Sequence, residues 1–283
     1  MKKFMLRSTL CLLAGTLAFT ACKEEKQEPA TTEDFVAVDD QSTGLSESDD
    51  AVSVAENVMD QSTSSMRTDE TKLTASNYCG AIITFTPKGN NPTGNIVVDF
   101  GTGKTCDDGR TRKGKINIAF TGKYRVPGTV QTITFDNYSV NDTKVEGTKV
   151  ITHSMVAGKY QTNIQVTGGK LTLKDGATVE WNSDRTRTWD GKGTPGWEDD
   201  EFSLTGTASG KSREGRAYSA QIMAPLLLRA SCVYTSGWVP VSGVLEVKPE
   251  GKTLKHTVDY GDGTCDRILN VTVGTRSFSR VVK

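Results

Sequence analysis

The chain has 283 residues, and its 34 basic and 34 acidic residues give a formal net charge of zero at pH 7. Its lysines and arginines are scattered, whereas nucleic-acid-binding proteins gather them on one surface, so we expect no nucleic-acid partner. After residue 21 no stretch is apolar enough to cross a membrane as a helix.

Residues 1–21 have the pattern of an export signal: three basic residues within the first seven, then an apolar run over residues 10–19. The run ends in Leu-Ala-Phe-Thr-Ala-Cys, closing at Cys22, and this resembles the lipobox of bacterial lipoproteins. The resemblance implies cleavage before Cys22 and attachment to its sulfur of a diacylglycerol, which carries acyl chains such as palmitate. The alternative is an ordinary signal peptide that is cut after Ala21. Acyl chains on Cys22 would hold the protein on a membrane without a transmembrane helix.

Residues 22–72 contain fourteen acidic and four basic residues, a net charge of −10. Their start, Lys-Glu-Glu-Lys-Gln-Glu, resembles the acidic signal that sends Bacteroidetes lipoproteins to the cell surface; a solvated tether is the alternative. With little apolar content, the stretch is predicted to be a flexible spacer. One short helix is predicted over residues 46–60, where Ala51, Val54, Ala55 and Val58 recur at helical spacing.

Residues 73–283 form the body of the protein, with 27 basic and 20 acidic residues. Apolar and polar residues alternate along it, as at Ile116, Ile118 and Phe120, and turn-forming residues interrupt the pattern about every ten positions. This pattern predicts an all-β body with antiparallel strands, arranged either as a sandwich or as one large curved sheet.

Two stretches of the body resemble each other: residues 99–107 and residues 259–266. Each has Asp, an aromatic residue, a Gly-x-Gly corner and a cysteine, which is typical of a strand, a tight turn and a returning strand. We therefore expect two related modules, each bracketed by cysteines. Of the six cysteines, Cys11 is expected to leave with the signal and Cys22 to be acylated, so four remain. Four cysteines in an exported chain allow three alternative sets of disulfide pairs. The repeat favours pairing within each module: Cys79 with Cys106, and Cys232 with Cys265.

A tryptophan-rich window is the candidate ligand surface, because exposed indoles beside carboxylates and guanidinium groups often bind sugars. The interpretation that the sequence favours is that Trp181 and Trp189 pack in the core. The candidate residues are Trp181, Asp184, Arg185, Arg187, Trp189 and Trp197.

Sites for metals, cofactors and catalysis have weak signals. The turn aspartates Asp107, Asp108, Asp259 and Asp262 offer oxygen ligands to a hard cation, but their spacing matches no established loop, and turn hydrogen bonding is the favoured explanation. No cofactor is predicted. The common catalytic motifs are absent, so the sequence favours a protein that is not an enzyme. A glycoside hydrolase that uses two carboxylates remains an alternative, because such a pair needs proximity and no motif.

The body also resembles an uncharacterised family of exported Bacteroidetes lipoproteins. The similar runs include Val98-Asp99-Phe100-Gly101, Phe120-Thr121-Gly122-Lys123-Tyr124, Phe135-Asp136-Asn137-Tyr138, Trp181-Asn182-Ser183 and Pro240-Val241-Ser242-Gly243. The resemblance implies an exported β-rich domain and no particular activity.

The expected function is that of a membrane-anchored envelope lipoprotein, a binding or structural module in the outer membrane. It is expected at the cell surface or, alternatively, at the periplasmic face. A carbohydrate-binding accessory protein and a carboxylate-dependent glycoside hydrolase are the alternatives, and a glycan or an envelope protein is the expected partner.

Overall fold

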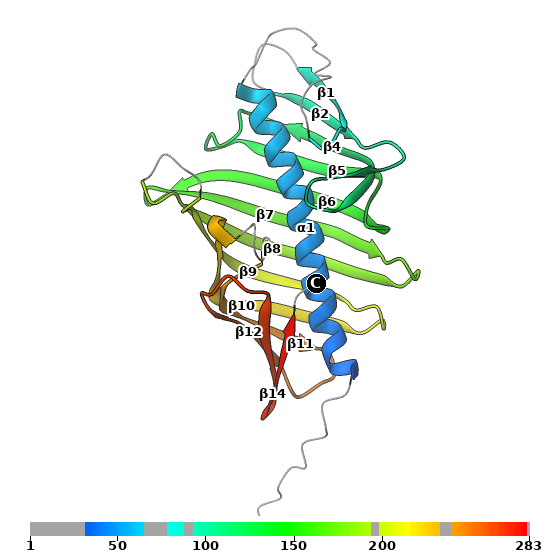
Figure 1. Ribbon diagram of the computed structural model, residues 1–283, viewed down its shortest axis with the longest axis vertical. Coiled ribbons are helices and arrows are strands. Elements are labelled where there is room, and N and C mark those ends of the chain that lie inside the picture. The colour runs from blue at the N-terminus through cyan, green and yellow to red at the C-terminus, as the bar shows by residue number, and fades with distance from the viewer. Residues whose placement is uncertain (1–31, 65–77, 88–92, 194–197, 233–238, 282–283) are drawn as a thin grey trace, which may run out of the picture.

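The computed structural model describes residues 32–64, 78–87, 93–193, 198–232 and 239–281. It consists of one long helix, α1 (Thr32–Ser64), which lies across a single antiparallel sheet (Figure 1). The signal segment 1–21, Cys22 and Trp197 lie outside the described residues.

Fourteen strands and one short 3-10 helix follow α1 in the described part of the chain. The first seven strands are β1 (Ile82–Pro87), β2 (Gly94–Asp99), β3 (Lys104–Thr105), β4 (Thr111–Phe120), β5 (Val130–Val140), β6 (Thr143–Val156) and β7 (Lys159–Thr172). The remaining elements are β8 (Thr178–Asp190), β9 (Glu201–Lys211), β10 (Ala217–Arg229), η1 (Ala230–Cys232), β11 (Ser242–Pro249), β12 (His256–Asp262), β13 (Ile268–Val273) and β14 (Arg276–Val281).

The sheet is a simple meander in which chain neighbours are also sheet neighbours; the exception is the two-residue β3, which pairs with β4 beside the main path. Every pairing is antiparallel, as the alternating sequence pattern predicts. The prediction of an all-β body is therefore confirmed, and of the two predicted architectures the protein adopts the large curved sheet.

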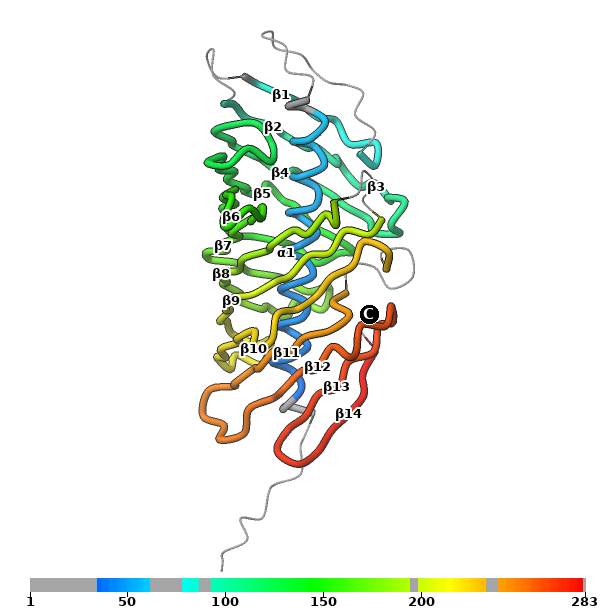
Figure 2. Tube along the Cα trace, turned by 90° about the vertical axis from the view of Figure 1, so that its left-hand side faces the viewer, coloured from blue at the N-terminus to red at the C-terminus, as the bar shows by residue number. Residues whose placement is uncertain are grey.

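A single sheet exposes both of its faces, and α1 covers one of them (Figure 2). The alternating residues of β4 show the result: Ile116, Ile118 and Phe120 are buried. Buried side chains form two clusters along the helix. One gathers the second half of α1 with strands from β1 to β8, and the other gathers the first half with strands from β7 to β13.

For residues 32–64 the helix corrects the prediction of a flexible tether, which covered residues 22–72; the rest of that range lies outside the described residues. Residues 32–64 form one continuous helix that includes the predicted short helix at 46–60, and its side chains at Val54, Ala55 and Val58 are completely buried. The ordering entropy that an acidic segment cannot offset alone is offset here by burial against a basic sheet. All of the described strands lie within the body predicted at residues 73–283, and α1 precedes it in the chain.

The two cysteine-bracketed modules lie at opposite ends of the sheet, and both predicted disulfides, Cys79–Cys106 and Cys232–Cys265, are confirmed. Their corners make the same contact: the N–H of Gly101 donates to Asp99 Oδ1 at 2.8 Å, and the N–H of Gly261 donates to Asp259 Oδ1 at 2.9 Å. The repeated sequence therefore makes the same Asp–Gly contact twice, although Gly101 follows β2 in a turn and Gly261 lies within β12.

Candidate functional site at the helix–sheet interface

The face of α1 that meets the sheet is built from small residues. Buried positions recur at intervals of four and three residues, so they form one stripe along the helix. The stripe consists of Ala37, Gln41, Gly44, Ser48, Ala51, Ala55 and Val58. Because all of these side chains except Gln41 are short, the helix backbone lies close to the strands, and residues on either flank of the stripe can reach the sheet as well.

Carboxylates on these flanks meet basic residues that the sheet points toward the helix. We call this set of contacts the charged seam. Its helical members are Asp39, Asp40, Glu47, Asp49, Asp50 and Glu56, and its sheet members are Arg110, Arg112, Lys149, Arg185, Arg187, Arg213 and Arg280. Six acidic side chains thus face seven basic ones. The seam explains why an acidic segment and a basic body occur in one chain of zero net charge.

Asp50 is the most connected carboxylate of the seam. It accepts hydrogen bonds from Arg112, with Nε 3.2 Å from Oδ2, and from the hydroxyl of Tyr138 at 3.1 Å. Arg110 adds an ion pair at 3.0 Å. Arg112 is only 1% exposed and also donates to Asp108 at 2.6 Å. This buried network fixes the middle of α1 to the strands near β4 and β5.

Trp181, Arg185 and Arg187 of β8 all bind α1. Trp181 Nε1 donates to Gln41 Oε1 at 2.9 Å, and the Arg185 guanidinium lies 5.1 Å from the centre of the Trp181 ring. Arg185 Nη2 is 2.9 Å from Asp49, and Arg187 forms an ion pair with Glu56. The alternating positions of β8 therefore serve as a row of anchors for the helix.

Two members of the seam have strongly shifted pKa values. Burial raises the pKa of Glu47 from its ordinary 4.5 to about 7, and the negative charge of Asp50 adds to the shift. Burial lowers the pKa of Lys149 from 10.5 to about 7, helped by the positive charge of Arg185. Lys149 is 3% exposed. Both groups therefore change charge near neutral pH inside the interface.

An aromatic cluster lies at the ends of inner strands of the sheet, where β6, β7 and β8 meet the loop after β4. Rings of His153 and Tyr160 stack with centres 5.7 Å apart, and Trp189 meets Tyr160 edge-on at 6.2 Å. The Arg125 guanidinium lies 4.9 Å from the Trp189 ring. Burial, followed by Arg187 and Arg125, lowers the pKa of His153 to about 4. This imidazole is therefore neutral at physiological pH.

The predicted ligand surface is not one surface. Trp181 and Arg185 are each 2% exposed and contact α1, so the structure corrects the prediction for these two residues. Arg187 is engaged by Glu56, and Trp189 packs in the aromatic cluster. Asp184 is exposed and accepts hydrogen bonds from Asn163 and Gln165 of β7, and Trp197 lies outside the described residues. Core packing, the interpretation that the sequence favours, describes Trp181.

Three of the four turn aspartates that could offer ligands to a metal serve in hydrogen bonds within the protein. Asp108 binds Arg112, Asp259 accepts the N–H of Gly261, and Asp262 accepts the N–H of Thr264 at 3.1 Å. Asp107 is exposed. Within the part of the chain that the structure describes, no three His, Cys, Asp or Glu side chains gather as a metal site would require.

Comparisons with known proteins add no relative: no protein-family model, no curated protein and no solved structure matches the chain. In the described ranges no helix combines the length and the apolar character needed to span a bilayer.

Sequence reasoning missed the charged seam, including Asp50, Arg112 and Lys149. The available signal was the four-and-three spacing of small residues from Ala37 to Val58, which is a helical periodicity without large apolar side chains. Apolar residues recur in a sustained run at helical spacing only in the second half of the helix, so the sequence predicted a helix there alone.

Proposed function

We propose that the protein is an acyl-anchored lipoprotein of the outer membrane that acts as a binding or structural module, with α1 as a rigid bracket between the anchor and the sheet. The observation that carries the proposal is the course of α1 across the full sheet. A helix of 33 residues is about 50 Å long. Thirteen strands side by side span roughly 58 Å.

Both ends of the bracket are packed. Near its start, Phe35 meets Phe278 of β14 with ring centres 5.1 Å apart, and Asp39 pairs with Arg280 of the same strand at 3.2 Å. Toward its end, Val58 and Met59 are buried in the cluster that includes Ile83 of β1. The helix therefore ties the two edge strands of an open sheet together.

The bracket starts close to the proposed anchor. Cys22 lies ten residues before Thr32, and ten residues of extended chain reach at most about 36 Å. An acyl chain on Cys22 would therefore hold the β14 end of the sheet near the membrane surface. A long flexible spacer, the arrangement expected from the sequence, would let the body move much farther away.

Two experiments test the proposal. Labelled palmitate should enter the full chain and not the Cys22→Ser variant, and that variant should leave the membrane fraction. In membrane-bound protein, spin labels on β14 should lie closer to the lipid surface than labels on β1. Membrane association that persists in Cys22→Ser, or equal depths for the two strands, would contradict the anchored bracket.

The glycan-binding alternative loses its main support, because Trp181 offers no free ring face to a sugar. A glycan array probed with the full chain remains the direct measurement. Glycan binding by the full chain that Trp189→Ala abolishes would restore this alternative.

A further inference from the structure

The Arg185 side chain is buried with donors to spare. It is 2% exposed, and its Nη2 contacts Asp49 at 2.9 Å and Ser48 at 3.1 Å. Its Nε and Nη1 are also buried, and neither has an acceptor within hydrogen-bond distance in the described protein. A buried donor without a partner is costly, so a charged guanidinium in this position calls for a further acceptor.

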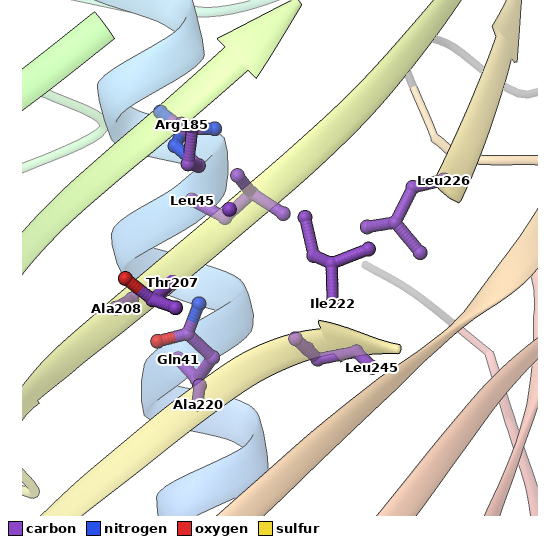
Figure 3. Close-up of a pocket in the computed structure, with 10 residues that line it drawn as sticks. Gln41, Leu45, Arg185, Thr207, Ala208, Ala220, Ile222, Leu226 and Leu245 are labelled. Atoms are coloured by element: carbon purple, nitrogen blue, oxygen red, sulfur yellow. The ribbon is translucent and has the colours of Figure 1, made fainter. Parts of the chain in front are cut away.

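A small cavity lies directly beside Arg185, between α1 and strands β8 to β11 (Figure 3). The centre of a water molecule can occupy about 10 Å³ of it. Most of its lining is aliphatic, from Leu45 of α1 and from Ile222, Leu226 and Leu245 of the sheet. The space therefore suits one small molecule or one monatomic ion.

Irregular strands form the wall of this cavity. The pairing of β10 with β9 shifts register between Gln221 and Leu226, and its pairing with β11 shifts between Ile222 and Leu227. Gly206 on β9 lines the cavity with a φ of +129°, a conformation that side chains disfavour. Bulges of this kind occur preferentially beside functional sites.

The chemistry of the lining distinguishes an anion from a water molecule. A buried water needs acceptors for its own two protons. Apart from Arg185, the polar side chains of the lining are Gln41 and Thr207, and the Gln41 oxygen already accepts from Trp181. An anion needs donors alone, and Arg185 has them.

We propose that the cavity beside Arg185 binds one small monovalent anion of the size of chloride, with the free N–H donors of the guanidinium as its main contact. The anion would lie between α1 and β8 to β11, so its binding would stabilise the docked helix. This site is independent of acylation at Cys22 and of the membrane bracket.

The first test is thermal unfolding of the full chain in sodium chloride, sodium bromide and sodium gluconate at equal ionic strength. The unfolding midpoint should rise by several degrees and saturate with either halide, and it should not do so with gluconate, which is too large for the cavity. Arg185→Met should abolish the difference. Arg213→Met removes an exposed basic residue of the seam away from the cavity. This variant should keep the difference between halide and gluconate, and it therefore controls for the general effect of salt on the seam.

A second variant and a crystal address the case in which Arg185→Met fails to fold. Ala220→Val adds carbon to the cavity wall and should weaken the halide effect while leaving Arg185 in place. A crystal of the wild type grown in bromide should show an anomalous peak next to Arg185. Equal midpoints in halide and gluconate, a halide effect that persists in Arg185→Met, or a cavity that contains only water would overturn the proposal.

Discussion

The backbone of α1 at Gly44 packs directly against the indole of Trp181: a Cβ added at position 44 would come within 2.6 Å of Trp181 Cγ. The indole cannot move aside freely, because its Nε1 is bonded to Gln41, one turn earlier on the same helix. Position 44 therefore sets how closely the helix approaches the sheet.

Gly44→Ala should destabilise the protein. Overpacking costs about 1–3 kcal/mol, whereas alanine returns at most about 1 kcal/mol through its better helix propensity. We expect the free energy of unfolding in urea to fall by about 1–2 kcal/mol. Asn57→Ala, at an exposed position of α1, is the matched control and should leave stability unchanged or slightly higher. A stabilising Gly44→Ala would show that the helix is not pressed against Trp181.

Removing Asp50 should expose the cost of a buried ion pair. Asp50→Ala leaves Arg112 without its main partner on α1, and we expect a loss of about 3–5 kcal/mol in urea unfolding. Combining it with Arg112→Met should cost clearly less than the sum of the two single changes, because the uncompensated charge is gone. The exposed pair Lys144 and Glu146, 2.9 Å apart, is the control and should be additive within about 0.5 kcal/mol.

Lys149 should make stability rise with pH above neutrality. Its pKa is about 7 in the folded protein and 10.5 in an exposed lysine, so between these values the unfolded chain binds more protons. The stabilisation is complete above pH 10.5 and is lost as the pH falls toward 7, with a slope of up to about 1.4 kcal/mol per pH unit. Lys149→Met should flatten the slope of unfolding free energy between pH 7 and 10.5. An unchanged slope, equal to that of the exposed control Lys144→Met, would contradict the shift.

Glu47 should make stability fall as the pH rises from 4.5 to 7, the opposite of the effect of Lys149. Its pKa is raised from 4.5 to about 7, so the folded state binds more protons than the unfolded chain between these values. The resulting stabilisation is complete below pH 4.5 and is lost as the pH rises to 7. Glu47→Gln should remove this fall, as measured by urea unfolding at several pH values. Glu146→Gln, an exposed carboxylate, should preserve it.

The disulfide of the first module should contribute substantially to stability. Cys79 and Cys106 close a loop with a sequence separation of 27, for which chain entropy gives about 3–4 kcal/mol. The double variant Cys79→Ser, Cys106→Ser should lose an amount of this order in urea unfolding. Its counterpart at Cys232 and Cys265, with a separation of 33, should lose a similar amount. Reductant should destabilise the wild type and leave a variant that lacks both bridges unaffected.

The amino-acid sequence by itself determined the local features of this protein. Alternation at positions such as Ile116, Ile118 and Phe120 specified strands, because side chains of a strand point alternately to its two faces. The repeated Asp-aromatic-Gly corner specified two equivalent Asp–Gly contacts and the pairing of four cysteines. Each of these features depends on residues that are near one another in the chain or that repeat a local pattern.

Only the tertiary structure decided the role of residues 32–64. Their acidic residues and small side chains indicate a flexible tether when the segment is considered alone, since nothing in it can bury enough apolar surface. The partners that stabilise it, such as Arg112, Arg185 and Arg213, are between 62 and 173 residues away in the chain. Their convergence on one face of the sheet depends on strand order and register, so Trp181 and Arg185 become contacts of a helix and not an exposed surface.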